Sequence, residues 1–216
     1  MIARTLLFLW LAAWTVIALV WPPLVPSLEE TTRVMYFHIP VAWMSFVALA
    51  WSMGHSIAYL KSRNIEHDHR ASAAAEIGLV FCLAATLSGS LWAKSMWGSW
   101  WNWDPRETSI FFLLLIYGAY LALRSSIEGE ERRARLSAIY SATAFVTVPF
   151  LMFIVPRIYF SLHPDPLINT AGKIKMDPQI RIAFYSMFLG FVGLFAWMFS
   201  LRVRVMRLAR RSAAAL

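Results

Sequence analysis

An unusual density of tryptophan lies near the middle of this chain. The stretch WGSWWNWDPRET, residues 97–108, holds four of the eleven tryptophans: Trp97, Trp100, Trp101 and Trp103. At helical spacing, Trp97, Trp100 and Trp101 would share one face. Such a face could stack against a large, flat, apolar ligand arriving from lipid. The alternative is a belt of indole rings at the membrane–water interface, where tryptophan is enriched.

Two histidines are expected on the same side of the membrane as these tryptophans. They are His38 and His163. Neutral imidazole is a ligand for haem iron, and two imidazoles can bind it from opposite faces. Zinc is disfavoured because this side offers no third or fourth histidine or cysteine. The alternative for each histidine is a structural role at the interface.

Haem also carries two carboxylates, which arginine pairs with through its planar guanidinium. Arg106 and Arg157 are the candidates for these contacts, and lipid phosphate is their alternative partner. The remaining histidines are interpreted as structural. His55 lies inside the second apolar run, whereas His67 and His69 are expected in a solvated loop.

Aspartate–proline pairs mark two expected helix starts. Asp104 precedes Pro105, with Glu107 three residues after the aspartate, and Asp177 precedes Pro178. A capping aspartate followed by proline at the first helical position is a typical helix start. Asp104 therefore has a capping role whatever else it does.

Residues 22–39, which follow the first apolar run, contain two further local signals. Ser27 and Glu30 have capping-box spacing, which predicts a short helix beginning there and ending near His38. Pro40 suits the first turn of the second span. Pro149 lies inside the fifth apolar run, where it is expected to kink a helix.

The elements that must position these residues are transmembrane helices. The chain has 216 residues, of which 59% are hydrophobic and 15% charged, and its mean hydropathy is +0.57. A membrane span needs about 20 apolar residues. The sequence predicts an all-α polytopic protein, one domain over residues 1–216. Its six expected spans are residues 4–21, 41–60, 73–93, 108–123, 136–155 and 181–201.

The distribution of basic residues predicts the topology. Thirteen of the twenty Lys and Arg residues fall on the side that holds both termini, which makes that side cytoplasmic. The Trp-rich loop between the third and fourth spans then lies outside. The net charge of +8 therefore indicates contact with anionic lipid or a cytoplasmic partner, not with nucleic acid. The first span is expected to stay uncleaved, because no small-x-small site follows it.

Several classes of protein are excluded by missing residues. Cys82 is the only cysteine and there is no CxxC pair, so neither a thiol oxidoreductase nor a c-type cytochrome is expected. No P-loop motif is present, so the chain does not hydrolyse ATP by itself. We expect a subunit that binds and moves a ligand, not an independent enzyme.

The sequence closely resembles the tryptophan-rich WWD motif of proteins that handle haem in cytochrome c biogenesis. The motif WGSWWNWDPRETS, the flanking YFHIPVAW and VPRIYFSLHP, the size and the six spans are similar to the haem exporter protein C family, CcmC. The resemblance covers essentially the whole chain. The larger relatives of the superfamily, CcmF and CcsA, have more spans than this chain can contain.

The resemblance implies a function and a set of site residues. Haem b is held transiently on the periplasmic face of the bacterial inner membrane, and it is presented to the haem chaperone CcmE. The partner subunits are the ATPase CcmA and the membrane proteins CcmB and CcmD. The iron ligands would be His38 and His163, and the haem platform comprises Trp97, Trp100, Trp101 and Trp103 with Asp104 beside it.

Three other functions remain open at this point. The protein could be a transporter subunit for haem or another solute, which buried polar residues within the spans would favour. It could be a haem–protein ligase of the CcsA or CcmF type. It could also be a scaffold whose tryptophans only anchor it, which an absorption spectrum of the purified protein would decide.

Overall fold

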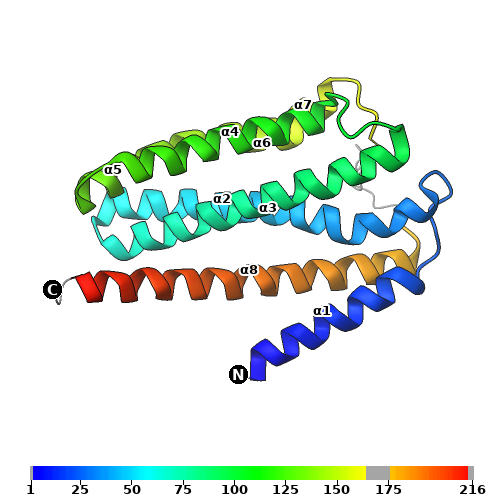
Figure 1. The fold of residues 1–216 in the computed structure, drawn as a ribbon, viewed down its shortest axis with the longest axis horizontal. Coiled ribbons are helices and arrows are strands. Elements are labelled where there is room, and N and C mark those ends of the chain that lie inside the picture. Colours follow the sequence, from blue (N-terminus) through cyan, green and yellow to red (C-terminus); the bar gives the residue numbers. More distant parts are fainter. Residues whose placement is uncertain (1, 164–175, 214–216) are drawn as a thin grey trace.

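The computed structural model describes residues 2–163 and 176–213, and every regular element among them is helical (Figure 1). Six helical segments are long and apolar enough to cross a membrane, which confirms the predicted fold class. Five of these segments contain the helices α1 (Ile2–Val20), α2 (Thr32–Ser62), α3 (Ile65–Trp97), α4 (Pro105–Ser126) and α8 (Pro178–Ala213).

The remaining span is broken into short pieces. It consists of α5 (Glu130–Ala144), α6 (Thr147–Pro149), the π-helical turn η2 (Phe150–Ile154) and α7 (Val155–Ile158). Proline removes a backbone donor and clashes with the preceding turn, and Pro149 stands where the α-helix gives way to the wider turn. The irregularity that the sequence predicted at this proline is therefore present.

The start of α2 differs from the prediction. Ser27 and Glu30 form no capping box: a 3-10 turn, η1 (Glu29–Thr31), leads directly into α2, and no side chain caps either helix. Pro40 lies inside α2 instead of in its first turn. The helix continues through the proline because lipid offers no hydrogen-bond partners, so the backbone N–H and C=O groups remain best paired within the helix. As a result His38 lies on the helix and not in the segment before it.

The segment expected to be a solvated loop is largely helical. Asn64 caps α3 by accepting a hydrogen bond from the backbone N–H of Glu66, so His67 and His69 lie in the first turns of that helix. Asp68 is buried there, and Arg124 of α4 binds both its carboxylate oxygens at 2.7 and 2.6 Å. This paired contact fixes α3 against α4 and explains why the segment is packed.

Small residues allow α2, α3 and α5 to approach closely. Ser52 of α2 donates to the carbonyl of Ala71 in α3 at 2.8 Å, and its oxygen lies 3.0 Å from that of Ser141 in α5. A Cβ added to Gly78 would lie 2.6 Å from Leu49. Close approach through small residues, with hydroxyl contacts between helices, is typical of membrane bundles.

The two ends of the bundle hold different segments. Figure 1 shows the α2–α3 and α4–α5 connections at the same end as the last turns of α8. The segment joining α3 to α4, which carries the tryptophans, lies at the opposite end together with α7. The connection between the fifth and sixth expected spans, residues 156–180, lies in large part outside the described residues, because residues 164–175 are not among them.

Candidate functional site

A cavity of about 530 Å³ opens among α2, α3, α4, the broken fifth span and α8. Most of its lining is apolar, and its volume lies within the range typical of small-molecule sites. Five of the residues predicted from the sequence line it: His38, Trp101, Arg106, Arg157 and His163. Residues from three widely separated parts of the chain therefore meet at one site.

His38 is held in a defined orientation by α3. Its Nδ1 lies 2.9 Å from the hydroxyl oxygen of Ser88, and that hydroxyl donates its single hydrogen to the carbonyl of Ala84 at 2.8 Å. With the hydroxyl hydrogen on a backbone carbonyl, the serine oxygen accepts from the imidazole, and in this arrangement Nδ1 carries the proton. The other ring nitrogen, Nε2, keeps its lone pair and is the one able to bind a metal.

The ring of His38 fits against α3 because one residue there has no side chain. A Cβ added to Gly89 would lie 2.9 Å from Cε1 of His38, closer than real side chains approach. The glycine therefore sets how near the imidazole lies to α3, and the same glycine lines the cavity.

His163 is oriented by Asp104 and by two tryptophans. Its Nδ1 lies 2.9 Å from Oδ1 of Asp104, so this nitrogen donates to the carboxylate. Its ring packs at 5.4 Å from Trp92 and at 4.9 Å, edge to face, from Trp97, measured between ring centroids. As in His38, the remaining lone pair is on Nε2, and the carboxylate makes the imidazole a stronger ligand.

Burial keeps His163 neutral. It lowers the pKa of the imidazole to about 4, and the attraction of Asp104, which favours the protonated form, does not offset this effect. Near neutral pH the contact with Asp104 is therefore a hydrogen bond to a neutral ring and not an ion pair. A neutral imidazole is the form that coordinates metals.

Asp104 joins the start of α4 to the segment after α7. It accepts hydrogen bonds from the backbone N–H groups of Arg106 at 2.9 Å and Leu162 at 2.7 Å, and from the hydroxyl of Ser161 at 2.9 Å. Burial alone would raise its pKa, but these donors and His163 outweigh burial and lower it. The carboxylate is thus ionised and fully used, and the capping role read from the sequence is only part of what it does.

Glu107 holds the loop that carries the tryptophans. Its Oε2 accepts from the backbone N–H groups of Asn102 at 2.7 Å and Asp104 at 3.2 Å, which completes a capping box at α4. The loop also contains Trp103 at a φ of 56°, a left-handed conformation that costs energy for a large side chain. The acidic residue therefore stabilises a strained loop beside the cavity.

The tryptophans do not form one helical face, which corrects the prediction from their spacing. Trp97 ends α3, Gly98 adopts the left-handed conformation that terminates it, and the following residues are not helical. Trp101 lines the cavity and Trp97 packs on His163, whereas Trp100 and Trp103 are 54% and 68% exposed. The cluster is thus divided between holding a histidine, lining the cavity and facing outward.

The predicted arginines lie at the cavity, although Arg157 is partly engaged elsewhere. Arg157 Nη1 donates to the carbonyl of Phe153 at 2.6 Å. Other cations on this side have structural roles. Arg33 Nη1 donates to the carbonyl of Pro22 at 2.7 Å, and Lys94 Nζ to that of Gly98 at 2.8 Å.

Sequence reasoning missed four residues that orient the histidines: Trp92, Ser88, Gly89 and Ser161. Trp92 had a detectable signal, since it precedes the quoted motif by five residues and extends the tryptophan cluster. The other three are common residue types without a local pattern.

Comparison with known proteins identifies the family. A family model described as Heme exporter protein C, CcmC, matches residues 1–216. The chain belongs to the Heme exporter protein C family. This confirms the family resemblance seen in the sequence.

Individual members of the Heme exporter protein C family match most of the chain. The protein of that name from Bradyrhizobium diazoefficiens is 32% identical over 209 residues, covering 94% of this chain and 79% of its own length. The one from Paracoccus denitrificans is 32% identical over 208 residues, covering 95% and 86%. The Escherichia coli K12 protein is 30% identical over 183 residues, covering 80% and 69%.

Proposed function

We propose that this protein binds haem in the cavity between α2, α3, α4 and α8 and presents it for transfer during cytochrome c maturation. Membership of the Heme exporter protein C family supports the haem-handling role. The observation that carries the site assignment is that two histidines with Nδ1 already engaged line one apolar cavity.

The ligand chemistry of the two histidines suits haem iron. His38 on α2 and His163 beyond α7 come from separate parts of the chain, so they can bind the iron from opposite faces. Each ring is held by a partner at its Nδ1, Ser88 for the first and Asp104 for the second. Such partners usually change metal affinity by about 10- to 100-fold.

The rest of the cavity suits the porphyrin. Its apolar wall includes Trp101, and Trp92 packs beside His163, so aromatic rings are available to the faces and edges of a flat macrocycle. Arg106 and Arg157 would contact the two propionates. Trp100 and Trp103, exposed at the rim, would cover haem or contact the protein that receives it.

Delivery is the second part of the proposal. The recipient is the haem chaperone CcmE, and the cavity lies on the periplasmic side of the bacterial inner membrane. CcmA, CcmB and CcmD are the proposed partner subunits, with CcmA supplying ATP hydrolysis. The haem is haem b, bound transiently. In this scheme the chain works as a haem-handling subunit and carries out no reaction of its own.

Absorption spectroscopy of purified variants tests the proposal. His38→Ala and His163→Ala should each strongly reduce haem per protein, because each removes one iron ligand. His55→Ala and His67→Ala are matched controls, since both lie toward the other end of the bundle and should retain haem. A double variant of His38 and His163 with an unchanged Soret band would overturn the ligand assignment.

A second experiment separates a haem platform from an interface belt. Combined substitution of Trp97, Trp100, Trp101 and Trp103 should abolish haem retention and transfer while membrane insertion stays normal. A stacked aromatic contact contributes on the order of 0.5–1.5 kcal/mol beyond its burial. Losing several such contacts together should therefore weaken haem binding far more than losing one. Normal haem content in this variant would favour the belt. Attachment of haem to an apocytochrome by the purified protein alone would favour a ligase.

A further inference from the structure

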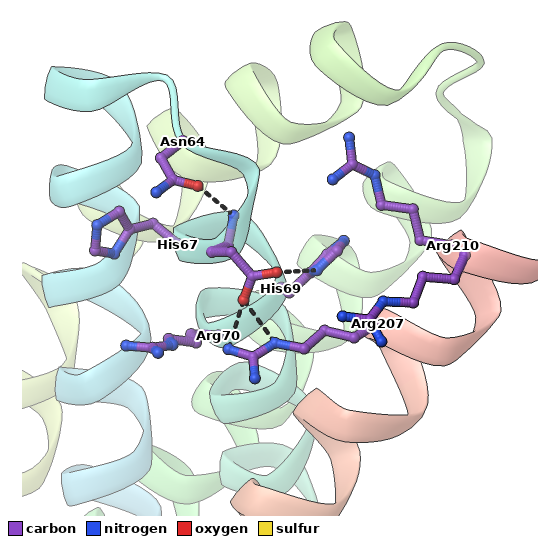
Figure 2. A pocket seen from close by; sticks show the side chains of 8 residues that line it. Asn64, His67, His69, Arg70, Arg207 and Arg210 are labelled. Carbon is purple, nitrogen blue, oxygen red and sulfur yellow. Dashed lines mark hydrogen bonds and ion pairs between the residues drawn. The ribbon is translucent and has the colours of Figure 1, made fainter. Parts of the chain in front are cut away.

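Figure 2 shows a second pocket, of about 420 Å³. It lies where α2 joins α3 and α8 ends, at the end of the bundle opposite the tryptophan loop (Figure 1). It is formed where the first turns of α3 meet the last turns of α8. Figure 2 shows Arg207 reaching from α8 toward α3, with His67 and Arg70 on the α3 side. The lining residues are Asn64, Glu66, His67, His69, Arg70, Arg207, Arg210 and Arg211.

Positive charge dominates this pocket. Four arginines line it against a single carboxylate, that of Glu66. Arg207 Nε pairs with Glu66 at 2.6 Å, and Arg210 Nε pairs with Glu130 at 3.0 Å. Within the described part of the chain, Arg70 and Arg211 have no carboxylate within ion-pair distance. The pocket therefore has two arginines free to bind an anion.

A buried histidine nitrogen in the pocket also makes no hydrogen bond to the described residues. The side chain of His69 is only 9% exposed, and its Nδ1 makes no hydrogen bond within residues 2–163 and 176–213. Glu66 Oε1 is 4.0 Å away, beyond hydrogen-bond distance. This contact, dashed in Figure 2, is an ion pair only when the imidazole is protonated. Buried polar atoms in folded proteins are nearly always hydrogen-bonded, so this nitrogen is available to a polar ligand in the pocket.

The length of α8 places the pocket at the level of lipid headgroups. With 36 residues, α8 is about 54 Å long, whereas the hydrocarbon core is about 30 Å thick. The last turns of α8 carry Arg202, Arg204 and the pocket arginines, which mark where the helix leaves hydrocarbon. Basic pockets between transmembrane helices at this level are typical sites for phosphate headgroups.

We propose that this pocket binds a phosphate oxyanion, carried by an anionic phospholipid headgroup or free in solution. Arg70 and Arg211 supply guanidinium donors, which match phosphate oxygens in pairs. The first turn of α3 adds the positive end of its helix dipole. His69 Nδ1, when it carries the proton, supplies a further donor. Because the anion would touch both α3 and α8, its binding would fasten the last turns of α8 to the bundle.

The test uses the full-length protein purified in a neutral detergent. Binding of phosphatidylglycerol is measured by native mass spectrometry, with phosphatidylcholine as the uncharged-headgroup comparison, and binding of inorganic phosphate by calorimetry. The pocket variant combines Arg70→Gln with Arg211→Gln. The matched control combines Arg132→Gln with Arg204→Gln, which removes the same charge from exposed positions outside the pocket.

The pocket variant should bind the anions about tenfold or more weakly, as expected for lost hydrogen bonds to a charged group, and the control should bind nearly as the wild type does. Binding of phosphatidylglycerol alone identifies a lipid site, and binding of inorganic phosphate alone identifies a soluble ligand. Either result supports the proposal, as does binding of both. Absence of both, or equal loss in the two double variants, overturns it.

A second variant keeps the proposal testable if the double variant fails to fold. Glu66→Gln removes the competing carboxylate and releases Arg207, so it should tighten anion binding. Unchanged or weaker binding in a correctly inserted Glu66→Gln protein would contradict the proposal. Haem content should stay normal in all these variants, since the pocket is at the opposite end of the bundle from the haem cavity.

Discussion

At the scale of single residues, the site depends on hydrogen bonds that leave one nitrogen of each histidine unused. Asp104 is the most connected of these residues, because it receives five donors from α4 and from residues 161–163. Ser88 does the corresponding work for His38 with a single hydroxyl. The aspartate of the tryptophan motif is therefore a positioning residue for His163, in addition to being a helix cap.

Asp104→Asn should weaken haem binding by about 10- to 100-fold, the usual cost of losing the partner of a metal-binding histidine. Asparagine keeps one acceptor for Nδ1–H but loses the charge and part of the acceptor capacity that Leu162 and Ser161 use. Haem titration followed at the Soret band measures the change. Asp177→Asn is the control, because Asp177 caps α8 without contacting His163. An equal loss of haem affinity in this control would show that Asp104 acts only as a helix cap.

The titration of His163 gives a prediction about pH. Its pKa is lowered from 6.5 to about 4, so the folded protein binds fewer protons at this site than the unfolded chain does between these values. Stability contributed here should fall as the pH is lowered through that window, and be unaffected above it. NMR of histidine-labelled, ligand-free protein in nanodiscs should show a neutral ring at pH 5.5. A midpoint near 6.5 would show that the imidazole is exposed.

At the scale of elements, two interruptions of regular structure create the site. The fifth span continues through the irregular turns around Pro149 and leads the chain to Ser161 and His163, while Gly98 ends α3 ahead of the tryptophan loop. Close contact between α2 and α3 positions the other histidine, His38. It places His38 beside Ser88 and Gly89 even though they are about fifty residues apart in sequence.

Gly89→Ala should displace His38 and reduce haem per protein about tenfold or more, since metal affinity depends on ligand orientation. The added methyl would improve the intrinsic helix propensity of α3, so the loss cannot come from a weaker helix. Gly118→Ala in α4 is the matched control, because a Cβ there meets no atom within 4 Å. Equal haem content in the two variants would show that His38 does not need this close approach.

At the scale of the whole molecule, the bundle separates an aromatic, apolar cavity at one end from an arginine-lined pocket at the other. The distribution of basic residues predicts that the arginine-rich end faces the cytoplasm. Ion pairs near that end, between Arg202 and Glu76 and between Arg207 and Glu66, join α8 to α3. The long α8 thereby connects the two ends mechanically, since its other end lines the cavity.

Reporter fusions test this orientation. A reporter after Leu216 should be active in the cytoplasm, and one inserted near Asn169, which lies outside the described residues, should be active in the periplasm. A third insertion, between α4 and α5, should agree with the first. The reverse pattern would place the cavity on the cytoplasmic side and contradict delivery to a periplasmic chaperone.

Hydropathy, charge and local motifs determined the architecture without any tertiary information. Local sequence accounts for the six spans, the caps at Asp104 and Asp177 and the irregularity at Pro149, because each depends on residues close together in the chain. Each span must be apolar enough by itself to enter the bilayer. Local rules failed where packing competes with them. Helix α2 continues through Pro40, and α3 includes residues 67–69. Neighbouring helices supply packing and hydrogen-bond partners that a short sequence window does not contain.

The detailed geometry of the site was decided only by the tertiary structure. Residue types identified His38, His163 and the tryptophans as candidates, but not which nitrogen each histidine leaves available or which tryptophans line the cavity. Those facts depend on Asp104 meeting Leu162, 58 positions away, and on His38 meeting Ser88, 50 positions away. A hydrogen bond has a direction and a length that hydropathy and spacing do not encode. It exists only after the helices have packed and the segment that follows α7 has met the tryptophan loop.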